Sequence, residues 1–396
     1  MNEDAEIQEL AGKILELGSR CWNCNFCYSA CPNFDSTRGF QVQGPSGILQ
    51  SLYYAVKWKD KVSESDWEAL RDTVYACTTC RSCELTCKNV SAGVSVLDVI
   101  ETGRKYLLES MFGPLPEQRA VLESIYKYGN PYGESPEKRL SWLGEMKVKR
   151  LPEARAEVLF YVGCTASYEP ELHNLARSLV KLFEYFRVDF GVLQGEVCCG
   201  DPVRSLGDSY LFEEMVAQNV DKFKAAGVKR IVTTSPHCFN AFLKKYENLE
   251  KDFQVEHYTT YLASLFEERK PALSGKGPVT VTYHDPCYLG KHNDIYDAPR
   301  ALLRAIPGVD LKEMEMNRQD SLCCGGGGGR MYAEVEEENR LADRRLGQAL
   351  AIGAEVVATA CPWCHNMLAN AVKDLGLEGK IKVLDVAELL AEALEE

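Results

Sequence analysis

Cysteine is the residue type in this sequence best suited to chemistry, and its spacing is regular. The chain has 17 cysteines in 396 residues, and residues 21–31 and 77–87 each hold four in the pattern C-x2-C-x2-C-x3-C. Disulfide scaffolds are typically short secreted chains, whereas this chain is long and its first residues, MNEDAEIQEL, lack the apolar stretch of a signal peptide. The spacing therefore favours metal ligation by thiolates in a reducing, anaerobic compartment.

The two N-terminal runs resemble the bacterial ferredoxin pattern, in which three cysteines hold one [4Fe–4S] cubane and the fourth reaches the other cubane. This rule predicts one cluster on Cys21, Cys24, Cys27 and Cys87, and a second on Cys77, Cys80, Cys83 and Cys31. Structural zinc is the alternative, but zinc motifs usually pair two CxxC units. Lys88 departs from the pattern, because proline usually follows the last cysteine. Residues 15–110 therefore resemble a two-cluster ferredoxin module.

The second half of the chain contains an internal repeat. Cys164, the Cys198-Cys199-Gly200 triplet and Cys238 recur as Cys287, Cys323-Cys324-Gly325 and Cys364. In both copies, short β-branched runs alternate with helical patterns such as 208–225 and 333–352, which indicates α/β units on a mainly parallel sheet. The cysteines follow the strands, so we expect them at the carboxyl edge of each sheet, where ligands bind.

The second copy resembles the CCG domain of heterodisulfide reductase, found in its B subunit and in the C-terminal part of its D subunit. The resemblance covers residues 155–396, and the preceding ferredoxin module makes the order match the D subunit nearly end to end. In that family five such cysteines hold a non-cubane [4Fe–4S] cluster that attacks a disulfide. The resemblance implies the ligands Cys287, Cys323, Cys324, Cys361 and Cys364.

The glycine run 325–329 is expected to help bind this cofactor, in particular through Gly325, Gly326 and Gly327. Glycines let the backbone approach a cluster closely, and their N–H groups can bond to sulfide. A phosphate-binding loop is disfavoured because no Lys-Ser/Thr follows. The Cys361-x2-Cys364 pair could instead be a thioredoxin-like redox pair, but the other spaced cysteines favour ligation.

The first copy departs from the pattern because Ser235 stands where the fourth cysteine belongs. A serine hydroxyl must lose a proton to bind iron, so it is a poor ligand at neutral pH. This copy is predicted to hold a differently ligated cluster or none, and a purely structural copy is the alternative. Its candidate ligands are Cys164, Cys198, Cys199 and Cys238.

Three histidines lie beside these cysteines, namely His237, His284 and His365. Imidazole titrates near neutral pH and could give a proton to a product thiolate. His284, with Asp285 beside it, is the predicted proton donor. For His237 an orienting role is the favoured interpretation.

The predicted fold class is a multidomain α+β protein with an α-helical two-[4Fe–4S] ferredoxin domain and duplicated α/β CCG domains with mainly parallel sheets. The expected boundaries are a ferredoxin-like domain at 1–130, a linker at 131–154, a first CCG domain at 155–272 and a second at 273–396. The two CCG domains are expected to face each other about a pseudo-twofold axis.

The charge and hydropathy of the chain exclude some classes of function. A net charge of −13 argues against a nucleic-acid partner, whose binding needs cationic contacts to phosphate. No uncharged apolar run approaches the ~20 residues that a membrane span requires. We expect a cytoplasmic protein, peripheral to a membrane only through a partner.

The predicted function is an iron–sulfur oxidoreductase subunit that passes electrons through two cubanes to the non-cubane cluster of the second copy, which reduces a disulfide. The alternative is a non-catalytic electron-transfer subunit of a flavin dehydrogenase, an electron-transferring flavoprotein or an acyl-CoA or benzoyl-CoA redox complex. Similar chains serve as iron–sulfur subunits of glycolate oxidase and anaerobic glycerol-3-phosphate dehydrogenase. A redox sensor or scaffold is disfavoured, because no DNA-binding or signalling module is visible. No flavin or nicotinamide fingerprint is visible either, so a flavoprotein or b-type cytochrome partner is expected to supply electrons.

Overall fold

The chain divides into two units whose segments alternate along the sequence. The computed structural model describes residues 3–275 and 277–395. Unit 1 contains Met1–Glu123, Pro202–Phe212 and Leu322–Leu341. Unit 2 contains Ser124–Asp201, Glu213–Ser321 and Ala342–Glu396.

Unit 1 is helical. Its α-helices are α1 (Glu3–Ser19), α2 (Pro32–Ser36), α3 (Pro45–Lys57), α4 (Glu64–Tyr75), α5 (Ser82–Val90) and α6 (Val96–Glu109). Its 3₁₀ helices are η1 (Phe26–Ala30), η2 (Gln41–Gln43), η3 (Lys59–Lys61), η7 (Arg330–Tyr332) and η8 (Glu337–Asn339). Some helices continue from one unit into the other, namely α7 (Pro116–Tyr128), α10 (Asp201–Leu206), α11 (Ser209–Ala226) and α17 (Leu341–Ala351).

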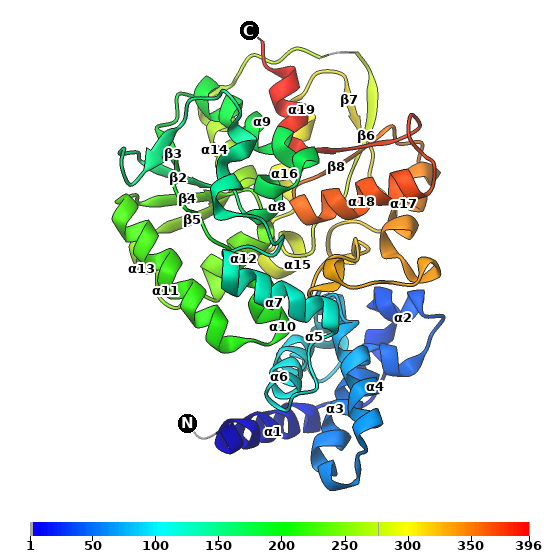
Figure 1. The fold of residues 1–396 in the computed structure, drawn as a ribbon. Helices are drawn as coiled ribbons and strands as arrows, with labels where there is room; N and C mark the ends of the chain where they lie inside the picture. The colour runs from blue at the N-terminus through cyan, green and yellow to red at the C-terminus, as the bar shows by residue number, and fades with distance from the viewer. Residues whose placement is uncertain (1–2, 276, 396) are drawn as a thin grey trace. The chain divides into compact units, whose positions relative to one another are not determined.

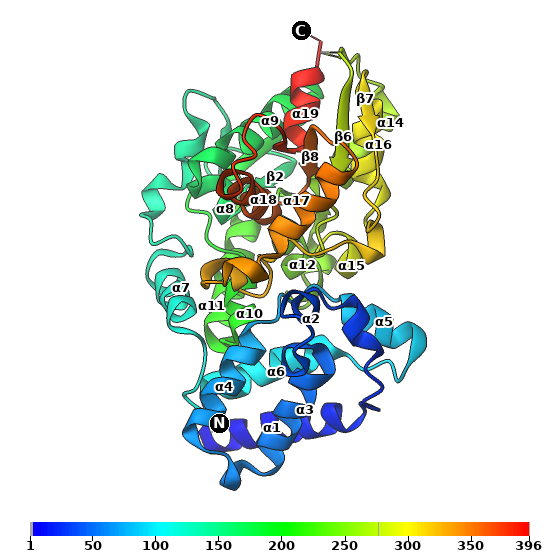
Figure 2. The ribbon, with the colours of Figure 1, turned by 90° about the vertical axis from the view of Figure 1, so that its right-hand side faces the viewer.

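In unit 1, helices α1, α3 and α6 pack against one another (Figure 2). Ile14, Leu52 and Val99 come from these three helices and are fully buried. Gly103 lets α6 approach α3 closely, because a Cβ atom there would lie 2.6 Å from Leu52 Cδ1. The helical segment that begins with α6 is interrupted near Gly113, and α7 begins after the interruption.

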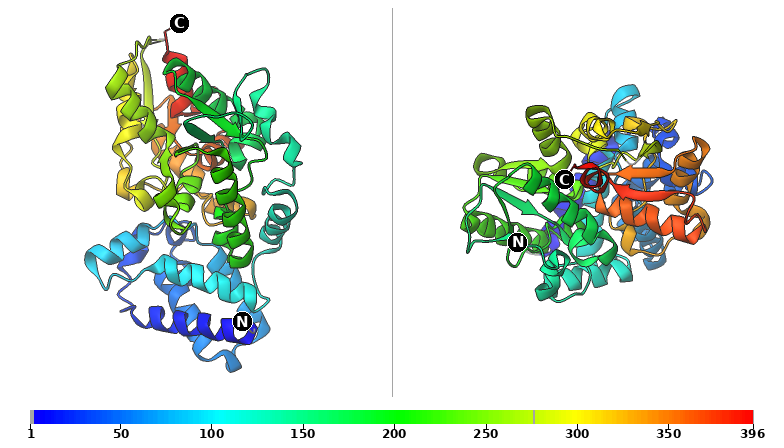
Figure 3. Two further views of the ribbon diagram at one scale, coloured as in Figure 1. Left: turned by 90° about the vertical axis from the view of Figure 1, so that its left-hand side faces the viewer. Right: turned by 90° about the horizontal axis from the view of Figure 1, so that it is seen from above.

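Unit 2 contains two sheets in which all neighbouring strands are parallel (Figures 1 and 3). The first sheet has the order β1-β3-β2-β4-β5 and the second β7-β6-β8-β9. The strands of the first are β1 (Lys149–Leu151), β2 (Val158–Tyr161), β3 (Phe190–Leu193), β4 (Arg230–Thr233) and β5 (Gln254–His257). Those of the second are β6 (Val279–Tyr283), β7 (Val309–Leu311), β8 (Val356–Thr359) and β9 (Lys382–Asp385).

Along the chain, the helices of unit 2 alternate with these strands. They are α8 (Cys164–Tyr168), α9 (His173–Tyr185), α12 (Pro236–Lys244), α13 (Leu249–Asp252), α14 (Tyr258–Arg269), α15 (Gly290–Asn293), α16 (Asp297–Ala305), α18 (Pro362–Asp374) and α19 (Val386–Ala393). The 3₁₀ helices are η4 (Pro136–Leu143), η5 (Pro170–Leu172) and η6 (Arg318–Asp320). Every residue of the central strands β2 and β8 is buried, so both faces of these strands are covered.

The two sheets confirm the sequence repeat. Without β1, the first sheet has the order β3-β2-β4-β5, which the second repeats as β7-β6-β8-β9. The copies also exchange helices in a symmetric way: α9 packs against α19, and α14 packs against α16. Each pair joins the first long helix of one copy to the last helix of the other, as a pseudo-twofold axis requires. One apolar core runs through both copies and includes Phe160, Val232, Val281 and Val356.

The predicted fold class is therefore confirmed, with two differences in detail. Strand β1 adds a fifth strand to the first sheet from residues 149–151, which the sequence assigned to a linker. The helical pattern at 333–352 becomes a helix only from Leu341. Residues 334–338 contain four glutamates, and repulsion between them disfavours helix there. The predicted domain boundaries stay predictions.

Candidate functional site

One set of ferredoxin cysteines lines a cavity in unit 1. Cys31, Cys77, Cys80 and Cys83 surround it together with apolar side chains such as Ile100, and its empty volume is about 410 Å³. Burial raises the pKa of the Cys31 and Cys83 thiols, and the neighbouring cysteines of the set raise it further. Thiolates so close together need a positive centre, which the irons of a cluster supply. These four residues therefore fit the predicted second cubane.

The other ferredoxin cysteines form a second group in unit 1. Burial raises the pKa of Cys27, and Cys21 and Cys87 add to the rise, so these three thiols lie close together. Cys24 is exposed and its Sγ lies 3.1 Å from Ser91 Oγ. Cys21, Cys27 and Cys87 therefore suit the predicted first cubane, and the assignment of Cys24 to it stays a prediction.

The two ferredoxin runs have the same local fold. Matching positions in the two runs take left-handed backbone conformations. Asn23 and Thr79 have φ of 54° and 52°, and Asn25 and Arg81 have φ of 63° and 69°. In each run the residue two after the first cysteine donates its N–H to that cysteine: Asn23 to Cys21 and Thr79 to Cys77, both at 3.4 Å. Such N–H···S bonds stabilise thiolate ligands and tune a cluster's potential.

The first CCG copy brings its four cysteines together within unit 2. Cys164, Cys198, Cys199 and Cys238 are all buried, and hydrogen bonds between thiols connect them in that order. Ser235 has another role: its Oγ accepts from the His237 N–H at 3.2 Å and caps α12. Four adjacent thiols fit a metal or cluster, so the arrangement favours a ligated group over a purely structural copy.

A buried cation supports this first-copy site. Arg139 donates from Nη1 to Cys164 Sγ at 3.1 Å and forms an ion pair with Glu196. Glu196 in turn accepts from the N–H groups of Val162 and Gly163 at 3.1 and 2.9 Å, immediately before Cys164. The network holds the Cys164 loop and places positive charge beside its thiolate.

The second copy divides between the units. Cys287, Cys361 and Cys364 belong to unit 2, and Cys323 and Cys324 belong to unit 1. Within unit 2, Cys361 occupies the N-cap position of α18 and is hydrogen-bonded to Cys364.

His237, from the first copy, contacts the second copy in unit 2. Its Nδ1 lies 2.9 Å from Asp201 Oδ2, and its ring also hydrogen-bonds Cys361. The ring stacks between Tyr288 and Trp363, with centroids 3.9 and 4.0 Å away. Burial alone would lower the pKa of His237, but the Asp201 carboxylate and Cys361 raise it above its ordinary value. The predicted orienting role fits these contacts.

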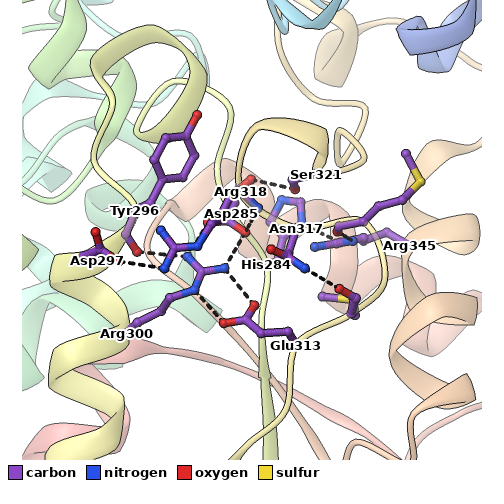
Figure 4. A network of polar contacts seen from close by, with 12 residues as sticks. His284, Asp285, Tyr296, Asp297, Arg300, Glu313, Asn317, Arg318, Ser321 and Arg345 are labelled. Atoms are coloured by element: carbon purple, nitrogen blue, oxygen red, sulfur yellow. Dashed lines mark hydrogen bonds and ion pairs between the residues drawn. The ribbon is translucent and has the colours of Figure 1, made fainter.

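His284 lies in a buried polar network of unit 2, drawn in Figure 4. Arg345 Nε donates to His284 Nδ1 at 3.1 Å, so the neutral ring carries its proton on Nε2. Burial, and then the charge of Arg345, lower the pKa of His284 to about 3. A ring nitrogen of His284 lies within 4.8 Å of Cys364 Sγ. These contacts favour a neutral N–H donor over the protonated acid that the sequence suggests.

Asp285 does not pair with His284 but with Arg300. Arg300 donates to both Asp285 oxygens at 2.6 and 2.9 Å and to both Glu313 oxygens at 2.7 and 2.8 Å (Figure 4). This bidentate pairing fixes the loop between β6 and Cys287. His365 is buried with its Nε2 4.0 Å from Glu388 Oε2, and burial lowers its pKa to about 4.

Steric contacts within unit 1 explain why glycines occupy residues 325–329. The Gly325 N–H donates to Cys323 Sγ at 3.4 Å, and Gly200 repeats this bond to Cys198 Sγ in the first copy. A Cβ atom at Gly327 would collide with Thr78 O. The run therefore fits against the ferredoxin loop as well as bonding to sulfur.

Several polar residues near the cysteines have no signal in the sequence. Arg104, Arg139, Asp201, Glu196 and Arg345 are buried or nearly so, yet they belong to no motif. Only Asp201 stands next to a motif, directly after Cys198-Cys199-Gly200.

Two known domain types match the chain. A 4Fe-4S dicluster domain matches residues 18–90, and a cysteine-rich domain named CCG matches residues 158–243 and 281–369. The predicted ferredoxin module and the predicted CCG duplication are thereby confirmed, and the chain carries several iron–sulfur clusters. No helix within residues 3–275 and 277–395 is long and apolar enough to cross a membrane.

Three curated relatives are similar over most of the chain. FadF of Bacillus subtilis, named as a probable iron-sulfur-binding oxidoreductase, is 37% identical over 91% of this chain and 52% of its own. The EtfAB:quinone oxidoreductase of Syntrophomonas wolfei is 36% identical over 82% of this chain and 47% of its own. The D subunit of the dihydromethanophenazine:CoB--CoM heterodisulfide reductase of Methanosarcina barkeri is 30% identical over 97% of this chain and 95% of its own. This chain spans about half the length of the first two relatives.

Proposed function

We propose the following function for this chain, which belongs to the family of CCG-domain iron–sulfur oxidoreductases. It receives electrons one at a time from a redox partner through its two cubanes. It then delivers them to the cluster of the second CCG copy, where a disulfide is reduced. The observation that carries this proposal is the complete set of five cysteines in the second copy, beside a buried histidine that presents an N–H group.

The reaction consumes two electrons and two protons and breaks one sulfur–sulfur bond to give two thiols. When bound, the second-copy cluster supplies one-electron transfer and an iron that can bind sulfur. His237 holds Cys361 in place through a hydrogen bond, and Asp201 in turn bonds the His237 ring. His284, fixed by Arg345, keeps Nε2–H as a hydrogen-bond donor, and a ring nitrogen of His284 lies within 4.8 Å of Cys364 Sγ. Among the described residues that N–H has no other partner, so it is available to a ligand sulfur.

A second candidate is an electron-transfer protein with no substrate of its own. The relatives FadF and EtfAB:quinone oxidoreductase are more similar in sequence than the heterodisulfide reductase relative, and the name of one of them specifies a quinone. Ser235, which replaces a cysteine in the first copy, also favours this candidate. In this case a flavoprotein would donate the electrons and a quinone or second partner would accept them.

One assay distinguishes the two candidates. The purified chain is reduced anaerobically with a viologen dye and mixed with a panel of small and protein-borne disulfides, or with a soluble quinone analogue. If the chain is a disulfide reductase, two thiols form for every two electrons consumed. The Cys361→Ser variant should then lose this activity. Rapid reoxidation by the quinone analogue, with no thiol from any member of the panel, would establish the electron-transfer candidate instead.

A further inference from the structure

Arg104 connects three stretches of unit 1 that are far apart in the sequence. It lies on α6 and is completely buried. Its Nη2 donates to Cys77 O at 2.7 Å and to Val74 O at 3.1 Å. Its Nη1 donates to Ser205 O at 2.7 Å and to Gly328 O at 2.8 Å. A guanidinium has five N–H donors in a rigid fork, so one side chain can hold all these carbonyl groups.

Two of these stretches follow the paired cysteines of the CCG copies. Ser205 lies shortly after Cys198-Cys199, and Gly328 lies shortly after Cys323-Cys324. The third stretch contains Cys77, the first cysteine of the second ferredoxin run. Arg104 therefore ties a predicted cubane ligand loop to the segment that carries a CCG cysteine pair.

The glycine run brings these backbones into direct contact. A Cβ atom at Gly328 would lie 2.5 Å from Cys77 O, and Gly328 has a φ of 62°. The next residue, Gly329, accepts from Gln118 Nε2 at 3.1 Å. Only glycine permits both the left-handed conformation and this close approach. The segment 327–329 is therefore built to lie against the Cys77 loop.

The thiols of these two stretches also interact. Burial raises the pKa of Cys77, Arg104 opposes the rise, and the thiolates of Cys80 and Cys323 add to it. Cys323 is thus close enough to Cys77 for their charges to interact. The other ferredoxin set faces solvent at Cys24, whereas Cys80 and Cys83 are buried.

We propose that Arg104 and residues 327–329 form an electron-exit junction from the cluster at Cys77 to the Cys323-Cys324 pair. Arg104 is a positioning residue that fixes the separation of the two groups, and the set that includes exposed Cys24 receives electrons from the partner. The proposal rests on the proposed function, because it requires a cluster in the second copy. Each transfer moves one electron, so two transfers supply the pair that one disulfide takes up.

The physical reason lies in electron tunnelling, whose rate falls steeply with distance and is higher along bonded paths than across open space. The covalent path from Cys77 to Cys323 is long, but the contact at Gly328 reduces it to one short jump at Cys77 O and the backbone between Gly328 and Cys323. The Arg104 guanidinium also places a fixed positive charge beside Cys77, which favours the more negative, reduced form of a cluster there. Loss of the contact is expected to slow transfer. Loss of the charge alone would make a cluster at Cys77 a stronger reductant, so Gly328→Ala, which changes no charge, isolates the effect of the contact.

Two variants of the full-length protein test the junction. Arg104→Gln removes the charge and most of the donors, and Gly328→Ala pushes the loop away from Cys77 O without changing any charge. Gly353→Ala is the matched control, because Gly353 has a φ of 70° but nothing within 4 Å of an added Cβ. Arg119→Gln controls for the loss of an arginine in unit 1, since Arg119 is exposed and bonds only locally, to Gly113 O.

The measurements are iron content, cubane potentials, freeze-quench electron paramagnetic resonance of the second-copy signal, and hydrogen exchange of residues 326–332. We expect Arg104→Gln and Gly328→Ala to keep their iron. Both are expected to show a slower rise of the second-copy signal, a loss of magnetic coupling between the clusters, and faster exchange at 326–332. Gly353→Ala and Arg119→Gln should match the wild type.

An unchanged rate in both variants, with exchange at 326–332 clearly faster, would overturn the proposal. If Arg104→Gln loses iron, the transfer rate of Gly328→Ala becomes the test of the proposal, because that variant leaves the charge and every cysteine in place. If both variants lose the iron of the Cys77 set, the segment is needed to hold that cluster, and the proposal is also overturned. A wild-type protein without any second-copy signal would instead contradict the proposed function itself.

Discussion

At the scale of single residues, buried polar side chains determine the surroundings of the thiols. Arg139 supplies positive charge to Cys164, His237 bonds to Cys361, and Arg345 fixes the ring of His284. A donor aimed at sulfur stabilises its charged form, because charge-assisted hydrogen bonds are stronger than neutral ones.

The tautomer of His284 leads to the first prediction. His284→Ala is expected to lower disulfide turnover by about 10- to 100-fold, the value of one hydrogen bond to a charged group. Gln reaches about as far as Nε2 and keeps an N–H donor, so His284→Gln should recover part of the loss. Turnover and iron content are measured together. If Ala and Gln are equally slow with full iron content, donation from Nε2 is not the role of His284.

Buried histidines also make stability depend on pH. Burial lowers the pKa of His257 to about 3, and its ring bonds to Thr234 O at 3.0 Å. The unfolded chain binds a proton near pH 6.5, whereas the folded chain does not, so stability falls as pH drops below 6.5. From this residue the free energy of unfolding should fall by about 1 kcal/mol between pH 8 and pH 6.

Urea unfolding at both pH values measures this effect, and His257→Gln is the informative variant because it cannot titrate. The difference in unfolding free energy between pH 8 and pH 6 should be smaller in the variant than in the wild type. An equal difference in the two proteins would mean that His257 is not the titrating group.

At the scale of elements, glycines set how closely helices and loops approach. Gly103→Ala places a Cβ atom 2.6 Å from Leu52 Cδ1, so we expect a loss of about 1–3 kcal/mol from overpacking. Gly12, on α1, has nothing within 4 Å, and Gly12→Ala should instead stabilise the protein by about 0.5–1 kcal/mol. Thermal unfolding of the two variants should shift in opposite directions. A shift of the same sign in both would contradict the packing argument.

The elements also show how far the sequence alone can lead. Cysteines that follow β-branched runs were expected at the carboxyl edge of parallel sheets, and Cys164 after β2 and Cys361 after β8 lie there. This succeeds because strand patterns and the cysteines beside them are local in sequence. The left-handed conformations at Thr79 and Arg81 have no such signal, since neither residue type favours them.

The contacts of the site are less predictable than its ligands. Arg139 and Cys164, or Arg345 and His284, meet only because the chain folds back over many residues. One arginine among many surface arginines looks the same in the sequence whether it is buried or exposed. Asp285 beside His284 suggested a pair, but Arg300 binds that carboxylate instead. Adjacency in sequence is therefore a poor guide to partners in a buried network.

At the scale of the whole molecule, the number of metal groups is the quantity to measure. Two cubanes and one second-copy cluster predict about twelve iron atoms per chain, and the four clustered thiols of the first copy predict one further metal group. Elemental analysis of the anaerobically purified protein gives both numbers. Fewer than about eight irons would contradict the two-cubane assignment.

Two cysteine variants distinguish the CCG copies. Cys323→Ser is expected to abolish the unusual second-copy signal in electron paramagnetic resonance. Cys198→Ser should remove only the group of the first copy and leave that signal nearly unchanged. If Cys198→Ser destroys the signal as completely as Cys323→Ser, the two copies act as one site, and the asymmetry inferred from Ser235 is wrong.

The alternation of units along the chain has a consequence for how such proteins can be recombined. Residues 202–212 and 322–341 belong to unit 1 although they lie within the two CCG copies in sequence. A chimera that joins a foreign ferredoxin module at residue 130 would keep these two segments but lose the helices of unit 1 that they pack with. The carbonyl groups of Gly328 and Ser205 would then lose the hydrogen bonds that Arg104 donates. The part of the chain to exchange as one module is therefore the ferredoxin domain together with both segments. Substitutions in the ferredoxin domain should be matched by substitutions in these segments.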